Sequence, residues 1–308
     1  MQYRTLLLLL TLTTFHLSAD PIPPPSTEET TPTISRSFVV KAGGKLNVDV
    51  DIGDFQIVTS DQSKIDVVVK REAPDLKENE ITDLLKKYPV SLTQNGNEVL
   101  IYSKSTEYST DGGLFSLLGH QSGRHRLTVH YQVTVPKKFE MQIKTAGGSI
   151  EIASLQGKVD TVTAGGSITL TDIQGPVSAS TSGGDIKTTR CTGQMVARTS
   201  GGSITINEFT GTSVHTETSG GNILTGLDSV PKSNCTFVTT GGNIILKFPA
   251  NFAVSLDAST VGGQISTSGI PDAVKNSPGS SSLKVKSTKG GPLLSLQTTG
   301  GNIQIVGQ

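Results

Sequence analysis

A pair of glycines that returns at nearly constant intervals constrains this chain more than any other feature. The first four pairs are 18 residues apart, and each pair has a threonine two residues before it and an isoleucine three residues after its first glycine. Periods near 20 residues are typical of stacked repeats. The glycine pairs are 147–148, 165–166, 183–184, 201–202, 220–221, 241–242, 262–263 and 300–301. The threonines are Thr145, Thr163, Thr181, Thr199, Thr218, Thr239, Thr260 and Thr298, and the isoleucines are Ile150, Ile168, Ile186, Ile204, Ile223, Ile244, Ile265 and Ile303.

A second glycine, ten residues after the first, divides each of the four most regular units into two short strands. Stacking such units at about 4.8 Å aligns identical side chains into columns and pairs the backbones of neighbours. We therefore expect an all-β fold, with residues 140–308 forming a single-stranded, parallel, right-handed β-solenoid. A left-handed hexapeptide helix would need an aliphatic residue every six positions, but glutamine or threonine follows the isoleucines there, at Gln156, Gln174, Thr192 and Thr210.

The inward side chains can be followed around two units. They are Ile168, Leu170, Ile173, Val177, Ala179 and Thr181, then Ile186, Thr188, Cys191, Met195, Ala197 and Thr199. In this register the two cysteines, Cys191 and Cys235, fall in different inward columns about two units apart, or roughly 10 Å. That distance exceeds the reach of a disulfide, so we predict two buried free thiols.

Residues 34–139 precede the repeats and form a small β-rich region with one short helix. Alternation places Leu46, Val48 and Val50 on one face of a strand, and residues 126–136 alternate in the same way. Residues 75–87 have the spacing of an amphipathic helix, and Asn95-Gly96 favours a hairpin. We expect this region to cap one end of the solenoid, and residues 269–282 with the final strands to cap the other. Gly290-Gly291 departs from the repeat and is interpreted as a turn.

The N-terminus reads as an export signal, residues 1–19. Arg4 is followed by an apolar run at 6–12 and by Leu17-Ser18-Ala19. The run falls short of the roughly 20 apolar residues of a membrane span, so we expect cleavage, no transmembrane segment in the mature chain, and a location in the cell envelope, at the cell surface or outside the cell. Residues 20–33, rich in proline and threonine, read as an extended linker.

A long polar stretch, residues 104–125, interrupts the β-rich region and carries one apolar cluster: Leu114, Phe115, Leu117 and Leu118. Loops of this length are functional or disordered. The cluster is therefore a candidate partner-binding loop, and the alternative is a flap folded back on the core.

No pattern predicts catalytic, cofactor-binding or metal-binding residues. His120 and His125 share the polar stretch without a recognised ligand spacing, and the glycine pairs lack both the Asp of calcium-binding nonapeptides and the Lys-Ser/Thr of phosphate loops. Arg198 and Glu217 occupy equivalent outward places and predict a surface ion pair. The net charge of zero gives no reason to expect nucleic acid or anionic lipid as a partner. We expect a protein that is not an enzyme and has no cofactor.

The segments AGGKLNVDV and VTVPKKFEMQIKTAGGSIEI, with the tandem GxVxAxTSGGSI-type units, resemble a bacterial exported family of putative adhesins, a domain of unknown function. The resemblance runs from Ser37 to the C-terminus. It implies a surface or envelope protein that binds another macromolecule or a glycan. Two alternatives stay open: a structural or assembly component of the cell envelope, and a polysaccharide-acting enzyme whose residues come from several units.

Overall fold

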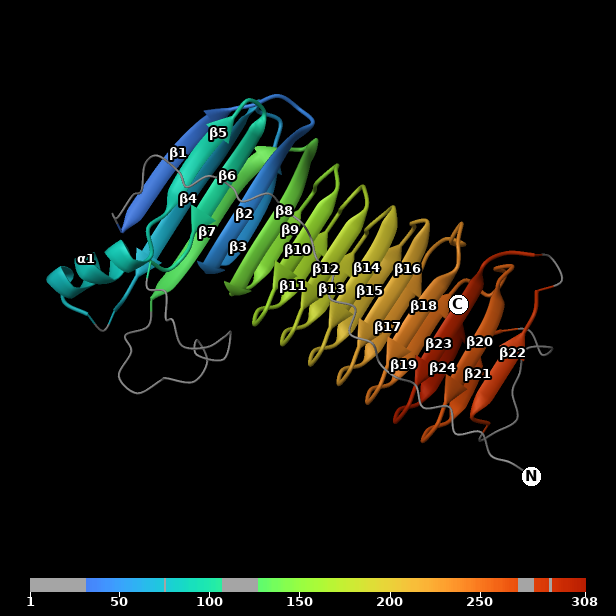
Figure 1. The fold of residues 1–308 in the computed structure, drawn as a ribbon. Coiled ribbons are helices and arrows are strands. Elements are labelled where there is room, and N and C mark those ends of the chain that lie inside the picture. Colours follow the sequence, from blue (N-terminus) through green and yellow to red (C-terminus); the bar gives the residue numbers. More distant parts are fainter. Residues whose placement is uncertain (1–31, 75, 107–126, 271–279, 288–289) are drawn as a thin grey trace.

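The computed structural model describes residues 32–74, 76–106, 127–270, 280–287 and 290–308. These residues form two long sheets that face each other across a narrow core, with one helix at the N-terminal end (Figure 1). Each sheet has 12 strands, and most neighbouring strands are parallel. The predicted all-β class, with long parallel sheets built from the repeats, is confirmed. The predicted signal peptide and most of the linker lie outside the described residues.

The strands of the first sheet, in spatial order, are β1 (Thr33–Val39), β4 (Lys64–Glu72), β7 (Thr128–Pro136), β3 (Asp54–Ser60), β9 (Ile150–Ala153), β11 (Ile168–Thr171), β13 (Ile186–Thr189), β15 (Ile204–Phe209), β17 (Ile223–Leu227), β19 (Ile244–Phe248), β24 (Ile303–Gly307) and β21 (Ile265–Ser268). Those of the second sheet are β22 (Ser282–Val285), β20 (Ser255–Thr260), β23 (Leu293–Thr298), β18 (Cys235–Thr239), β16 (Ser213–Thr218), β14 (Gln194–Thr199), β12 (Val177–Thr181), β10 (Val159–Thr163), β8 (Phe139–Gly147), β2 (Gly44–Ile52), β6 (Glu98–Ser103) and β5 (Ser91–Asn95).

Each repeat unit supplies one strand to the second sheet and the next strand to the first, and we call such a pair a rung. The register between rungs is that of the repeat: Ile168 lies beside Ile150 and Ile186, and Thr181 beside Thr163 and Thr199. Every side chain of the two predicted inward sets is buried. The core is therefore a set of identical or similar side chains stacked along the axis.

The repeated threonine and the second member of each glycine pair lie where neighbouring rungs meet. The hydroxyl of Thr181 donates to the carbonyl of Gly166 in the preceding rung (2.8 Å) and accepts from the N–H of Gly184 in its own rung (3.3 Å). A Cβ on Gly184 would lie 2.2 Å from the oxygen of Gly166. Among the glycine pairs of the repeat, only Gly148 has φ in the left-handed region, so backbone conformation does not explain the others. The second position of each pair must be glycine because the backbones of stacked corners approach too closely there for a side chain.

A continuous polar ladder follows the same corner. At most corners, the side chain of the residue after the glycine pair accepts a hydrogen bond from the backbone N–H of its counterpart in the next rung: Ser203 N–H bonds to Asp185 Oδ1 (2.7 Å), and Asn243 N–H to Asn222 Oδ1 (2.8 Å). The members of this corner ladder are Asp54, Ser149, Ser167, Asp185, Ser203, Asn222, Asn243, Asn302 and Gln264. It gives hydrogen-bond partners to backbone groups that lie outside the sheets.

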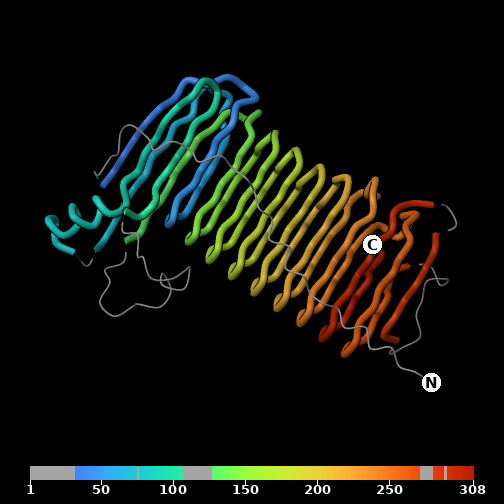
Figure 2. Tube along the Cα trace, viewed as in Figure 1, coloured from blue at the N-terminus to red at the C-terminus, as the bar shows by residue number. Residues whose placement is uncertain are grey.

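The rungs do not stack in the order of the sequence. The last rung, β23–β24, lies between β18–β19 and β20–β21, and β22 pairs antiparallel with β20 at the end of the second sheet. The expectation that the final strands cap the C-terminal end is therefore wrong, because they lie one rung inside it (Figure 2). Residues 271–279, part of the expected cap, lie outside the described residues.

The N-terminal end repeats this out-of-order stacking. The rung β2–β3 lies between β6–β7 and β8–β9, so the same two sheets run through residues 34–139 and 140–308. Beyond them, β4 and β1 continue the first sheet in antiparallel order, and the hairpin β5–β6 ends the second. The helix α1 (Glu78–Lys87) lies within the predicted helical range and is the one helix of the described segments.

Both cysteines are free and buried, as the repeat register predicts. Cys235 pairs with Leu294 in sheet register, and its sulfur accepts from the N–H of Val214 (3.3 Å). Burial raises the pKa of both thiols. They act as small apolar core residues.

Candidate functional site: the insertion corner

The repeat is interrupted most strongly at the corner between β6 and β7. Ser103 lies in register with Val50 and Thr145, and Tyr131 with Phe55 and Ile150. Residues 104–130, the last three of which begin β7, therefore stand where the neighbouring rung β2–β3 has only 51–54. We call this place the insertion corner. Breaks in an otherwise regular fold are where function is expected.

The start of the insertion is tied to the solenoid by charge. Lys104 Nζ contacts Asp49 Oδ1 at 2.6 Å and Asp51 Oδ1 at 3.2 Å, and the N–H of Ser105 donates to Asp51 Oδ2 at 2.8 Å. Burial acts to lower the pKa of Lys104, but the hydrogen bond to Asp49 and the charges of both carboxylates outweigh it and leave that pKa raised. Lys104 is therefore cationic throughout the physiological pH range.

The helix α1 also contacts the start of the insertion, residues 104–106, which we call the stem. The N–H of Thr106 donates to the carbonyl of Lys87, the last residue of α1 (2.9 Å). At the first turn of α1, the carboxylate of Glu80 accepts from the N–H of Lys77 (2.9 Å), which satisfies one of the backbone groups that a helix end leaves unpaired. The stem therefore runs between a strand and a capped helix.

Beneath the corner the core changes from aliphatic to aromatic and polar. Tyr131 stacks on Phe55 with ring centroids 4.3 Å apart, and burial raises its pKa. Arg71, also buried, donates from Nη1 to the carbonyl of Tyr88 (3.1 Å). The core at this end of the stack therefore includes a buried tyrosine and a buried arginine.

The end of the insertion meets the corner ladder. His130 Nδ1 lies 3.6 Å from Asp54 Oδ2, and Asp54 Oδ1 accepts from the N–H of Ser149 (2.7 Å). Both side chains of the first pair are about half exposed. His130 thus points outward, as strand alternation predicts, and stands above the first member of the ladder.

The predicted partner-binding residues Leu114, Phe115, Leu117 and Leu118 lie outside the described residues, as do His120 and His125. The position of the insertion in the fold is fixed by its two flanks alone. The stem contacts of Lys104 with Asp49 and Asp51 were not predicted, because they join strands that are distant in sequence and no local pattern marks them.

The predicted ion pair between Arg198 and Glu217 is confirmed, with Nε and Oε2 3.5 Å apart. Its side chains are nearly half exposed, so it contributes about 0–1 kcal/mol to stability. His215 lies on the same outer face, and burial followed by the charge of Arg198 lowers its pKa. His215 is therefore neutral at pH 7 and adds no charge to this pair.

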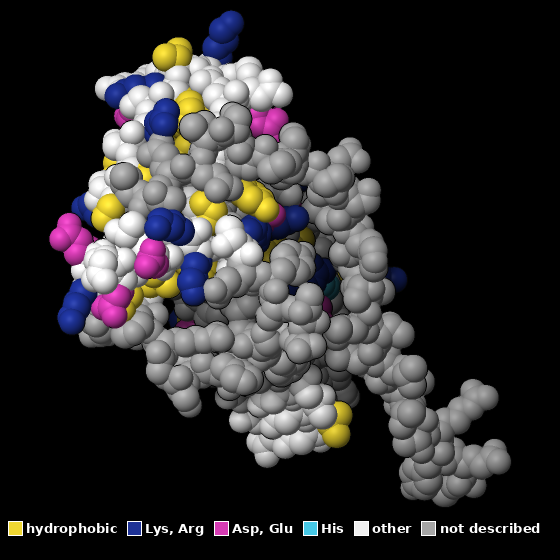
Figure 3. Space-filling model, turned by 60° about the vertical axis from the view of Figure 1, so that its left-hand side comes forward, with side chains coloured by type: hydrophobic (Ala, Val, Ile, Leu, Met, Phe, Trp, Pro, Cys, Tyr) yellow, Lys and Arg dark blue, Asp and Glu magenta, His cyan; other side chains and the backbone are white. Residues whose placement is uncertain are grey.

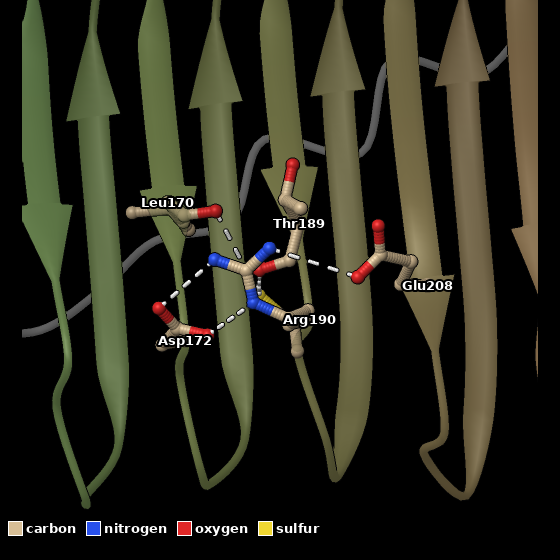
Figure 4. A network of polar contacts seen from close by, with 6 residues as sticks. Leu170, Asp172, Thr189, Arg190 and Glu208 are labelled. Carbon is tan, nitrogen blue, oxygen red and sulfur yellow. Dashed lines mark hydrogen bonds and ion pairs between the residues drawn. The ribbon is translucent and has the colours of Figure 1, made fainter.

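A second charged network, on the opposite sheet, was not predicted (Figure 4). Arg190 Nε contacts Asp172 Oδ1 at 2.6 Å, and its Nη1 lies 3.6 Å from Glu208 Oε2. The three residues follow one another on successive rungs, and each has left-handed φ, as does Ser154 before them. The hydrogen bond from Arg190 lowers the pKa of Asp172. Nothing in the residue types at this position marks it as left-handed in the sequence.

In the parts of the chain that the structure describes, no three His, Cys, Asp or Glu side chains come together as metal ligands. The N-terminal face shows basic, acidic and hydrophobic side chains interspersed, without a field of one sign (Figure 3). Within the same residues, no helix is both long and apolar enough to cross a bilayer.

Comparison with solved structures finds matches at low sequence identity. A putative adhesin from Bacteroides fragilis NCTC 9343 is 14% identical over 89% of this chain and 96% of its own, with a TM-score of 0.48. A putative lipid binding protein from Parabacteroides distasonis ATCC 8503 is 14% identical over 89% and 96%, with a TM-score of 0.42. A putative cell adhesion protein from Clostridium sporogenes ATCC 15579 is 12% identical over 90% and 100%, with a TM-score of 0.26.

No curated protein matches the chain. The family model of Toastrack DUF4097, a domain of unknown function, matches residues 41–306. That range runs from just before β2 to the last residue but one of β24. The chain therefore belongs to the Toastrack DUF4097 family.

Proposed function

We propose that this is an exported, non-catalytic, adhesin-like protein that holds a recognition loop at the insertion corner and binds another macromolecule or a glycan through it. The observation that carries the proposal is the insertion itself. Residues 104–130 replace a short corner at one place in a regular stack, and their stem is fixed by Lys104, Asp49 and Asp51.

The physical logic is that of a rigid scaffold that presents a variable loop. The stacked rungs fix the position of the stem, while the apolar side chains at 114–118 supply contact area of the kind found at interface centres. Two solved structures described as adhesion proteins support this class of function.

The test is binding of the mature chain, residues 20–308, to intact cells, matrix proteins and an immobilised glycan panel. Substitution of Phe115→Ala together with Leu118→Ala should weaken binding at least tenfold, because truncating an anchoring aromatic and aliphatic pair typically removes more than 1.4 kcal/mol. The matched control is Val162→Ala, an exposed apolar residue on the outer face of the second sheet, which should leave binding unchanged.

Unchanged binding of the double variant would remove the loop from the proposal. No binding by the wild-type chain, together with confinement to an internal envelope compartment, would favour a structural role. Release of reducing ends from a panel of polysaccharides would overturn the non-catalytic assignment.

We further propose that residues 1–19 direct export and are removed, and that the coil is single-stranded and right-handed, the hand favoured for parallel crossovers. Export is tested by N-terminal sequencing of the mature protein and by protease treatment of intact cells. An experimentally phased crystal structure tests the hand.

A further inference from the structure

The rungs β18–β19 and β20–β21 enclose a slot, which the rung β23–β24 fills. The contacts on both walls of this slot are those of the repeat. On one wall, Thr298 Oγ1 donates to the carbonyl of Gly242 (2.8 Å), and Asn302 N–H donates to Asn243 Oδ1 (2.7 Å). On the other wall, Gly301 O accepts from Thr260 Oγ1 (2.7 Å). The rung β23–β24 that fills the slot makes the ladder contacts of any other rung, so the slot recognises the repeat motif itself.

The rung β23–β24 is the last in the sequence but lies inside the stack. It follows β22, which lies at the outer edge of the second sheet, and must pass β20 to reach its place. The path from β22 to β23 is two strand spacings, or about 10 Å. Residues 286–292 connect them, and a segment of that length reaches roughly 25 Å when extended.

The connector is thus longer than its path requires. It also contains Gly290, which has φ +77° and no atom within 4 Å of an added Cβ. An open glycine of this kind lets the chain change direction without a steric clash.

We propose that the rung β23–β24 of one copy of this chain fills the slot of a second copy, so that the protein assembles by exchanging this rung. Both forms make the same ladder contacts, because the donated segment and the two walls are identical in each. A vacated slot would expose two unpaired strand edges on facing rungs, which favours capture of a matching segment. Exchange of an identical element is a low-cost route to a dimer. Because two chains combine, the fraction of exchanged dimer rises with protein concentration.

The test uses the full chain with paired cysteines on the corner ladder. Asn243 and Asn302 are neighbours in register across the slot wall, and the Cα spacing of adjacent strands, about 4.8 Å, is within disulfide range. In N243C/N302C the disulfide forms within one chain when the rung is in its own slot, and between chains when it is exchanged. The matched control, N222C/N243C, occupies the same ladder position on two rungs that are consecutive in sequence.

Both variants are refolded from urea at 1–100 µM, oxidised, and separated on non-reducing gels, with the disulfides identified by peptide mass spectrometry. We expect N243C/N302C to give covalent dimers whose ratio to monomer rises about tenfold for each tenfold rise in concentration while dimers are rare. The control should stay monomeric. Circular dichroism of the reduced variants checks folding, and Q264C/N302C, on the opposite wall, replaces a variant that does not fold.

Dimers that accumulate equally in the control would reflect random oxidation and would overturn the proposal. Disulfides confined to single chains at every concentration would overturn it as well. Neither result depends on the insertion between β6 and β7, so this proposal and the proposed function can fail separately.

Discussion

Replacing one glycine of a pair should be far more damaging than replacing the other. In the pair 183–184, an added Cβ on Gly184 would lie 2.2 Å from the oxygen and 2.5 Å from the carbon of Gly166, both backbone atoms. On Gly183 the nearest atom would be 3.6 Å away. Neither residue has φ in the left-handed region, so the two substitutions differ in steric contact and not in backbone strain.

The loss of stability in Gly184→Ala can be worked out from the backbone atoms that must move. Gly184→Ala forces two stacked corners apart by about 1 Å, since real Cβ contacts fall near 3.4 Å or beyond. Overpacking of this kind costs about 1–3 kcal/mol. The hydrogen bonds that Thr181 makes across the same corner add about 1 kcal/mol each if they break. Gly183→Ala should instead stabilise the protein by about 0.4–1 kcal/mol, because it restricts the unfolded chain.

Urea unfolding followed by circular dichroism measures the difference, and tyrosine fluorescence gives a second probe because the chain has no tryptophan. With an m-value of roughly 2–3 kcal/mol/M, the midpoint of Gly184→Ala should fall about 1 M below wild type, while that of Gly183→Ala stays level or rises. Equal midpoints, or a lower one for Gly183→Ala, would refute the claim that close approach dictates the second glycine.

Two further predictions concern the buried interior. Thr199→Val should lower the free energy of unfolding by about 1–3 kcal/mol, because it leaves the Gly184 carbonyl and the Gly202 N–H unpaired; Thr199→Ser, which keeps the hydroxyl, should lie much closer to wild type in the same urea titration. Cys191 and Cys235 should not react with a thiol reagent at pH 8 in the native protein, because burial encloses them and raises their pKa. Both should react in urea, and rapid labelling of either in the native state would contradict the packing described.

The sequence predicts the rung well because its period, its threonine and its isoleucine recur at fixed places. It does not predict the order of the rungs. Residues 255–268 and 293–307 both present the threonine, glycine pair and isoleucine that the surface of β18–β19 accepts. Local pattern gives no reason for one to dock before the other, so the inserted position of β23–β24 depends on the connections between strands and on the β20–β22 pairing at the end.

The sequence likewise predicts some features of the candidate site and not others. Composition marks residues 104–125 as a long polar loop, and the alternation within residues 126–136 places His130 on the outside. The contact of Lys104 with Asp49 and Asp51 depends on parallel pairing between β2 and β6, which are separated in the sequence by β3, β4, α1 and β5. The repeat shows where the glycine pairs fall, but the reason for them, the close approach of stacked backbones, has no signature in a single unit.

The inserted rung also determines how the molecule would bear a pulling force. A load applied at Gln308 acts on β24, which is bonded to β19 on one side and to β21 on the other. Extraction therefore has to shear two rows of hydrogen bonds at once, whereas a strand at the free end of a stack can be peeled away one bond at a time. A protein tethered through this end would resist detachment under flow better than a stack whose last strand in sequence was also its outermost.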